Sequence, residues 1–104
     1  MNVKMIMNWD IKPGRDQEYF EFTVREWIPG ITDLGLKPSG AWYTAYSREE
    51  DAPQILTELV AKDFTTIQEI LDTEEWQSLH DKMLEYVDNY EQKIVRIRNG
   101  GFQL

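Results

Sequence analysis

The sequence contains no cysteine and a single histidine among its 104 residues. The absence of cysteine excludes disulfide bonds, thiolate metal sites and cysteine nucleophiles. One histidine cannot supply a two-histidine metal site, and the carboxylates show no metal-ligand spacing. The pair Gly100-Gly101 is too short a signal for a phosphate-binding loop, and one histidine does not establish a catalytic triad. We therefore expect no metal site.

Basic residues are also scarce, with 11 Lys and Arg against 19 Asp and Glu, which gives a formal net charge of −8. Such a charge argues against binding to nucleic acid or to anionic membranes. Residues 1–10 contain no long apolar run, so we expect neither a signal peptide nor a membrane span. Together with the lack of cysteine, this predicts a cytoplasmic protein with neither nucleic-acid nor membrane partners.

Hydrophobic residues make up 41% of the chain and charged residues 29%, an ordinary globular balance. The length predicts one domain, residues 1–104. Aromatic residues reach 12% and include four tryptophans. That many rings need a buried surface, which a core, an interface or a pocket can supply.

The first third of the chain changes from a period of two to a helical period. Residues 3–11 alternate, with Trp9 on the fully apolar face, and predict a half-buried strand. Residues 15–28 predict an amphipathic helix, which Pro29 should either kink or end near residue 28, with a resumption to about residue 34 and Gly35 as the cap. The apolar stripe expected to face the core is Phe20, Val24, Trp27, Ile28 and Ile31.

The remainder predicts two more strands, a helical region and a final strand. The expected strands are residues 41–47, 54–62 and 92–98. Asp63 should cap a short helix over residues 64–71, and Thr73 a helix over residues 74–90. The order is βαββαβ, which predicts an α+β, ferredoxin-like fold: a four-stranded antiparallel sheet with the helices on one face. The other face retains apolar side chains, so we expect a homodimer.

Four segments carry a family pattern: residues 11–14, Trp27-Ile28-Pro29 with Gly35, Gly40-Ala41-Trp42, and residues 73–80. The pattern resembles the dimeric α+β barrel superfamily, and most of all its NIPSNAP-like and antibiotic-biosynthesis-monooxygenase-like members. The resemblance spans nearly the whole chain and implies the fold and the dimer. Because the superfamily includes enzymes and members without a known reaction, it does not name an activity.

His80 is the side chain whose ordinary pKa lies nearest neutrality. Haem-degrading members of the superfamily hold iron through a histidine in the second helix, with an asparagine on the first strand and a tryptophan ten residues before the histidine. Asn8 and His80 resemble two of these positions, but Ile70 stands where the tryptophan would be. His80 is therefore interpreted first as a helix residue, then as a pocket residue, and last as a haem ligand.

Polar residues on the strands form a second candidate group. Asn8 and Asp10 are expected on the face away from the helices, together with Arg96 and Arg98 of the neighbouring last strand. An ion pair there would be structural or would present arginine to an anionic or carbonyl group. Glu58 is expected on the same face, as a solvated residue or as a general base.

The aromatic residues Trp42, Tyr43, Tyr46 and Trp76 could line a cavity for a flat ligand, or could fill the core and the dimer seam. Three functions follow. One is a small-molecule-binding barrel that acts on an aromatic or apolar compound as a cofactor-independent monooxygenase or isomerase. The others are a non-catalytic structural or stress-response dimer, and haem binding through His80. Asn8, His80 and Arg96 are the candidate catalytic residues, and Trp42, Tyr46, Glu58 and Trp76 the candidate substrate-binding residues.

Overall fold

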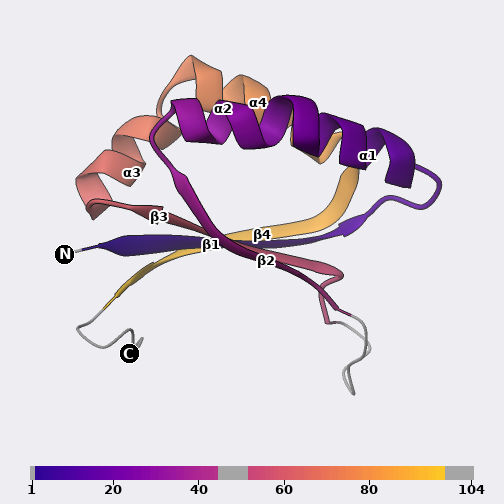
Figure 1. Ribbon diagram of the computed structural model, residues 1–104, viewed down its shortest axis with the longest axis horizontal. Coiled ribbons are helices and arrows are strands. Elements are labelled where there is room, and N and C mark those ends of the chain that lie inside the picture. The colour runs from indigo at the N-terminus through magenta and orange to yellow at the C-terminus, as the bar shows by residue number, and fades with distance from the viewer. Residues whose placement is uncertain (1, 45–51, 98–104) are drawn as a thin grey trace.

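The computed structural model describes residues 2–44 and 52–97. Four strands form one antiparallel sheet in the order β2-β3-β1-β4, and the helices all cover the same face of it (Figure 1). This confirms the predicted ferredoxin-like α+β fold. None of the helices in the described ranges is long and apolar enough to cross a membrane. The elements are β1 (Val3–Ile11), α1 (Asp16–Phe22), η1 (Thr23–Trp27), α2 (Ile28–Asp33), β2 (Lys37–Tyr43), β3 (Ile55–Ala61), α3 (Phe64–Leu71), α4 (Glu74–Leu84) and β4 (Val87–Arg96).

The core lies between the sheet and the helices, and β1 runs through its middle. Alternate β1 side chains are almost fully buried, because β1 pairs with β3 on one side and β4 on the other. The predicted caps are present at both later helices. The side chain of Asp63 accepts a hydrogen bond from the backbone N–H of Thr66, and Thr73 accepts one from Trp76. The buried β1 residues are Val3, Met5, Met7, Trp9 and Ile11.

The helix before β2 differs from its prediction. The residues of α1, η1 and α2 follow one another without a break, and η1 is a five-residue π-helical turn. A π turn holds extra chain per turn, so the buried face shifts from Tyr19 and Phe22 to Trp27 and Ile31. The expected stripe was therefore wrong at three positions, because the side chains of Phe20, Val24 and Ile28 are 50%, 67% and 44% exposed.

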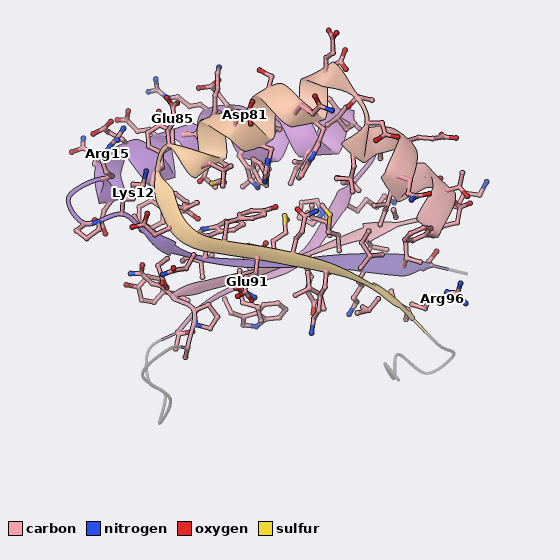
Figure 2. The ribbon with its side chains drawn as sticks, turned by 180° about the vertical axis from the view of Figure 1, so that it is seen from behind. Lys12, Arg15, Asp81, Glu85, Glu91 and Arg96 are labelled. Atoms are coloured by element: carbon pink, nitrogen blue, oxygen red, sulfur yellow. The ribbon has the colours of Figure 1, made fainter. Side chains whose placement is uncertain are left out.

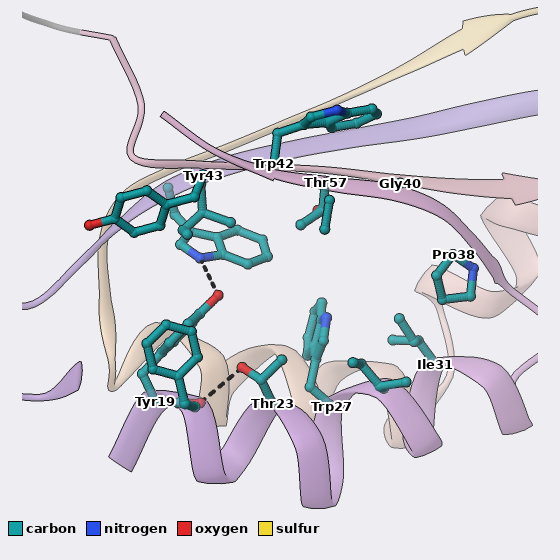
Figure 3. Close-up of a pocket in the computed structure, with 14 residues that line it drawn as sticks. Tyr19, Thr23, Trp27, Ile31, Pro38, Gly40, Trp42, Tyr43 and Thr57 are labelled. Atoms are coloured by element: carbon teal, nitrogen blue, oxygen red, sulfur yellow. Dashed lines mark hydrogen bonds between the residues drawn. The ribbon is translucent and has the colours of Figure 1, made fainter. Parts of the chain in front are cut away.

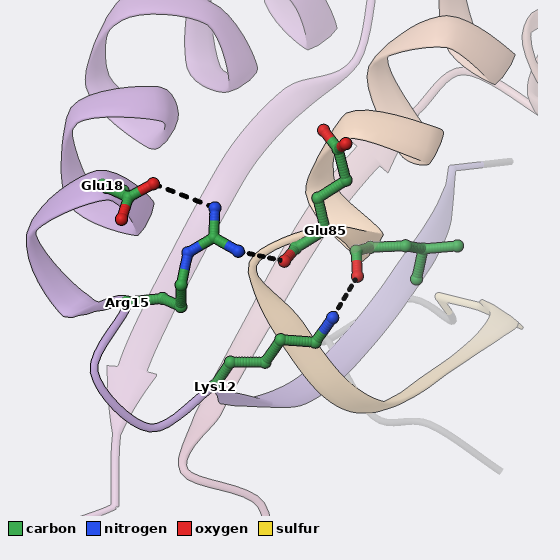
Figure 4. Close-up of polar contacts among 5 residues, drawn as sticks. Lys12, Arg15, Glu18 and Glu85 are labelled. Atoms are coloured by element: carbon green, nitrogen blue, oxygen red, sulfur yellow. Dashed lines mark hydrogen bonds and ion pairs between the residues drawn. The ribbon is translucent and has the colours of Figure 1, made fainter.

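The helix predicted over residues 74–90 ends at Leu84, and Val87 already belongs to β4. Two positively charged side chains donate hydrogen bonds to carbonyl groups at this end of the helix (Figure 4). Lys12 Nζ donates to the carbonyl of Leu84 at 3.4 Å, and Arg15 Nη1 donates to that of Glu85 at 3.4 Å. Positive charge at a helix C-terminus stabilises its unpaired carbonyls, which fixes the end of α4 here.

Two strands begin earlier in the chain than predicted. β2 starts at Lys37, since the backbone pairs with β3 from Lys37 to Tyr43 despite an irregularity between Pro38 and Gly40. Residues 45–47 of the predicted strand lie outside the described residues. β4 begins at Val87 and contains a bulge opposite Trp9, where Asn89 has a φ of 57°. The bulge lets both Val87 and Tyr90 pack toward the helices.

Candidate functional site

A pocket of about 280 Å³ lies between the long helical segment and the edge of the sheet (Figure 3). The segment α1-η1-α2 forms one wall, and β2 and β3 form the other, with Trp9 of β1 at the inner end. The helical wall consists of Tyr19, Phe20, Thr23, Trp27, Ile28 and Ile31. The sheet wall consists of Pro38, Gly40, Ala41, Trp42, Tyr43, Ile55 and Thr57.

The inner end of the pocket is a packed group of aromatic rings. Trp9 is 1% exposed and meets both Tyr19 and Trp27 edge to face, with ring centroids 6.4 Å and 6.1 Å apart. Behind it, Tyr90 stacks on Trp9 at 5.8 Å. Such geometries are the favourable ones for aromatic pairs, so these contacts stabilise the shape of the inner end of the pocket.

Apart from Tyr43 at the mouth, three hydroxyl-bearing side chains supply polar atoms to the lining. The indole N–H of Trp9 donates to the hydroxyl of Tyr19 at 3.0 Å, and Thr23 Oγ1 donates to the backbone carbonyl of Tyr19 at 2.9 Å. On the opposite wall, Thr57 Oγ1 donates to the carbonyl of Met7 at 3.4 Å. Burial raises the pKa of the Tyr19 hydroxyl, and the neighbouring polar groups of Trp9 and Thr23 partly offset this rise. Tyr19 is therefore a neutral hydrogen-bonding group at physiological pH.

The pocket wall carries no formal charge. Among the described residues, its lining contains no Asp, Glu, His, Lys or Arg. Its mouth is open, because Phe20 is 50% and Tyr43 58% exposed. At the mouth, Gln54 Nε2 donates to the Tyr43 hydroxyl at 2.7 Å and holds that ring at the edge of β2. The site can thus bind apolar surface, but it offers no side chain that exchanges a proton near neutral pH.

The π turn is part of the pocket wall, since Thr23 begins it and Trp27 ends it. The backbone N–H of Ile28 bonds to the carbonyl of Thr23, five residues earlier. Single π turns inside helices occur frequently at functional sites, because they redirect side chains that a regular helix would place elsewhere. Here the turn directs Trp27 and Ile31 into the interior beside the pocket.

His80 lies away from this pocket, on α4. Its imidazole stacks on Trp76 with centroids 5.5 Å apart and meets Tyr90 edge to face at 4.7 Å. Its Nε2 atom is buried and makes no hydrogen bond within the described residues. Burial lowers the pKa of His80, and the charge of Asp81 acts in the opposite direction.

These surroundings do not suit the binding of haem iron through Nε2 of His80. Iron would need open space directly before a ring nitrogen, whereas Nε2 of His80 is closed off beside the rings of Trp76 and Tyr90. Ile70, which replaces the tryptophan of the haem-degrading pattern, is 7% exposed and packs in the core. The described residues also contain no cluster of His, Cys, Asp or Glu that could hold a metal ion.

The other two candidate catalytic residues lie in different places. In the sheet, Asn8 lies opposite Leu56 of β3 and Glu91 of β4. Its side chain lies on the sheet face away from the helices. Arg96 lies opposite Val3 in the sheet register, and the side chain of Val3 is buried under the helices. Arg96 therefore lies on the helix side of the sheet, and the expectation that Arg96 shares a face with Asn8 was wrong. Figure 2 shows it at the far end of β4 from Lys12 and Arg15. The bulge in β4 is the physical reason, because one inserted residue changes which alternate side chains face the core.

The acidic candidates on this face have structural partners. Glu58 pairs with Lys4 at 3.1 Å and also accepts a hydrogen bond from Ser39. Asp10 accepts hydrogen bonds from the backbone N–H of Gln54 and from Asn89 Nδ2. The expected meeting of Asp10 with Arg96 is not found, and Arg98 lies outside the described residues.

The predicted aromatic candidates separate into three groups. Tyr43 lines the pocket, as expected. Trp42 belongs to the lining, but its ring lies against Gly40, on the other face of β2, and is 51% exposed. Trp76 is 4% exposed and packs against Trp27 at 5.6 Å as a core residue. Tyr46 lies outside the described residues.

Sequence reasoning did not identify Tyr19, Thr23 and Thr57 as site residues. The sequence did contain one indication of this site. The helix has more apolar positions than one buried stripe needs, and an aromatic edge strand follows it. The assignment of Trp9, Phe20 and Trp27 to the core alone missed that their rings also border a cavity. The π turn that brings these positions together has no recognisable sequence signature.

No model of a protein family matches the sequence, and no protein of curated function matches it. Solved structures match most of the chain. An EthD (ethyl tert-butyl ether degradation) family protein from Bacillus halodurans is 18% identical, with a TM-score of 0.73 and coverage of 94% of this chain and 100% of that one. A NIPSNAP family protein from Agrobacterium tumefaciens is 17% identical, with a TM-score of 0.69 and coverage of 95% of each chain.

A candidate antibiotic biosynthesis monooxygenase from Nitrosomonas europaea is 14% identical, with a TM-score of 0.64 and coverage of 89% of this chain and 86% of that one. These neighbours share the ferredoxin-like α+β fold of this chain, which confirms the resemblance seen in the sequence at the level of the fold. At such low identity the similarity establishes the fold, and the activity has to be argued from the site.

Proposed function

We propose that this protein binds a small, uncharged, planar aromatic or otherwise apolar compound in the pocket between α1-η1-α2 and the β2–β3 edge. The observation that carries the proposal is an open pocket of about 280 Å³ whose inner end is built from Trp9, Tyr19 and Trp27. Ligand sites usually measure about 300–1,000 Å³, so this volume suits a compound of one or two fused rings.

The lining also limits the chemistry at the site. An isomerase that moves a proton needs a base, and no carboxylate, imidazole or amine belongs to the described lining. Binding alone needs no such group. Cofactor-independent monooxygenation is the second candidate, because a substrate that itself supplies electrons to oxygen requires mainly a dry, apolar enclosure. The Nitrosomonas neighbour, named as a monooxygenase candidate, supports this alternative.

The sheet face opposite the helices supports a homodimer. Leu56, Val60 and Val95 are only partly buried there, and Trp42 is 51% exposed. Apolar surface of this kind is usually covered in a folded protein, and a second copy of the sheet would cover it. Sedimentation equilibrium at micromolar concentration should give twice the chain mass of 12.3 kDa. A strictly monomeric mass would contradict the dimer without affecting the pocket.

Calorimetric titration with naphthalene tests the binding proposal. Ala41 lies on exposed β2 and lines the pocket, so Ala41→Trp should fill the site without disturbing the core. We expect saturable binding to the wild type and its loss in Ala41→Trp. Gln77→Trp is the matched control, since it adds the same ring at an exposed position of α4 outside the lining. Equal binding by all three proteins, or by none, would refute the proposal.

A further inference from the structure

We infer that the ligand carries one neutral hydroxyl group and that Tyr19 and Thr23 recognise it, so that the pocket selects hydroxylated aromatic compounds, such as phenols, over bare hydrocarbons and over anions. The inference rests on the proposed ligand-binding function and specifies its ligand class. The two hydroxyl groups of the helical wall, those of Tyr19 and Thr23, differ in whether their own proton is already donated in a hydrogen bond.

The hydroxyl proton of Thr23 is already donated in a hydrogen bond within the helix. Its Oγ1 donates to the backbone carbonyl of Tyr19, one turn earlier, at 2.9 Å. A hydroxyl oxygen that has donated its proton retains lone pairs and can only accept further hydrogen bonds. Thr23 therefore presents an acceptor to the pocket that its side chain helps to line.

Tyr19 is in the complementary state. Its oxygen accepts the indole N–H of Trp9 at 3.0 Å, which fixes the position of the hydroxyl at the inner end of the pocket. The remaining group is its own O–H, which donates to no side chain or backbone carbonyl in the hydrogen bonds of the described residues, although the Thr23 hydroxyl lies near enough to affect its pKa. Because Tyr19 is 3% exposed, this donor has little access to bulk water. A buried donor favours a ligand atom that accepts from it.

One donor and one acceptor in the same wall match a group that both accepts and donates. A ligand hydroxyl does so, since it accepts from Tyr19 and donates to Thr23 Oγ1. A carboxylate lacks the proton for Thr23 and would be moved from water into a wall without a compensating cation. An ether can accept but cannot donate. The geometry thus favours a neutral hydroxyl over either alternative.

Four probes with the same ring system separate these properties: naphthalene, 1-naphthol, 1-methoxynaphthalene and 1-naphthoate. Each is titrated calorimetrically into the wild type, Tyr19→Phe, Thr23→Val and Thr32→Val. Thr32→Val is the matched control, because Thr32 Oγ1 donates in the same way to a carbonyl one turn earlier, that of Ile28 at 2.7 Å, but Thr32 does not line the pocket. Naphthalene serves as the internal test that each variant retains a folded, open pocket.

The wild type should bind 1-naphthol about three- to tenfold more tightly than naphthalene, the effect of about one net hydrogen bond. This preference should disappear in Tyr19→Phe and in Thr23→Val and persist in Thr32→Val, while the affinity for naphthalene stays within about twofold. 1-Methoxynaphthalene should bind less tightly than 1-naphthol, and 1-naphthoate least tightly of the four.

Naphthalene binding without any preference for 1-naphthol would overturn this inference and leave the proposed function intact. So would a preference that survives in both Tyr19→Phe and Thr23→Val. Equal affinity for 1-naphthol and 1-methoxynaphthalene would overturn the donor role of the ligand, and tight binding of 1-naphthoate would overturn its neutrality. If none of the four probes binds, the proposed function and this inference fall together.

Discussion

The indole N–H of Trp9 donates a hydrogen bond of 3.0 Å to the hydroxyl of Tyr19, and this bond joins the central strand to the first helix beside the pocket. Both residues are buried, at 1% and 3% exposure. Removal of the hydroxyl would leave the Trp9 N–H without a partner in an environment that water does not reach.

We therefore predict that Tyr19→Phe lowers the free energy of unfolding by about 1–3 kcal/mol, the usual effect of an unsatisfied buried donor. Urea denaturation measures it. The control is Tyr43→Phe at the pocket mouth, where the residue is 58% exposed and the change should stay within about 0.5 kcal/mol. Equal stability of wild type and Tyr19→Phe would show that the Trp9–Tyr19 bond is not important for stability.

A second prediction concerns pH and His80. Burial keeps the pKa of the folded His80 below its ordinary value of 6.5, which the unfolded chain should approach. As the pH falls through 6.5, the unfolded chain therefore takes up a proton that the folded protein does not bind. The contribution of His80 to stability is thus complete above this pH and declines below it.

Urea denaturation at about pH 7.5 and about pH 5.5 checks this linkage. The wild type should lose stability on acidification, and His80→Phe should lose less, because phenylalanine keeps the aromatic contacts with Trp76 and Tyr90 but does not titrate. No other histidine contributes to this pH range. The same pH dependence in wild type and variant would mean that His80 protonates equally well in the folded protein.

A third prediction concerns the contact between α2 and α4 at Gly30. A Cβ atom at this position would lie 2.7 Å from Cδ2 of Leu79, so the missing side chain lets the two helices approach closely. Alanine favours helix over glycine by about 1 kcal/mol, but Leu79 must move to make room for it. Gly30→Ala should therefore stabilise the Leu79→Ala variant by about 1 kcal/mol and the wild type by clearly less. A double-mutant cycle by urea denaturation measures the difference, and equal effects in both backgrounds would exclude the contact.

A fourth prediction concerns the cationic cap of α4. Arg15 donates to the Glu85 carbonyl, pairs with Glu18 at 2.9 Å and lies over the ring of Tyr86 at 4.9 Å. These contacts are largely solvent-exposed, so Arg15→Gln should cost only about 0.5–1 kcal/mol, and less at high salt.

Arg25→Gln is the matched control for Arg15, because Arg25 lies in the helical segment that directly follows Arg15, is exposed and makes no ion pair within the described residues. Thermal melts of both variants at low and high salt check the prediction. If Arg15→Gln is as stable as Arg25→Gln, the side chain of Arg15 does not stabilise the C-terminal end of α4, and backbone hydrogen bonds alone determine where the helix ends.

The fold was predictable because it depends on local patterns that survive in a single sequence. Alternation over residues 3–11 marked β1, and Asp63 and Thr73 marked the helix starts that the structure shows. The errors arose where contacts between distant segments determine whether a residue belongs to a helix or to a strand. The apolar residues Val87 and Tyr90 fit a helical stripe equally well, and only the pairing of β4 with β1 places them in a strand.

The candidate site was less predictable because its residues come together through a rotation of the helix. A regular helix at Thr23–Trp27 would bury Phe20, Val24 and Ile28, but the π turn exposes them and turns Trp27 and Ile31 inward. Residues with distinctive chemistry, His80, Asn8 and Arg96, drew attention from sequence alone, yet none of them lines the pocket. Tyr43 was found because an aromatic edge strand is visible in the sequence.

The central claim is that the pocket between α1-η1-α2 and β2–β3 binds apolar compounds. The most direct test is NMR of the isoleucine δ1-methyl groups during titration with naphthalene. The methyl resonances of Ile28, Ile31 and Ile55 should shift in proportion to saturation, because these residues line the pocket. Those of Ile67 and Ile70, on the buried face of α3 and outside the lining, should not shift. Shifts confined to Ile67 and Ile70, or no saturable shift at any isoleucine, would contradict the claim.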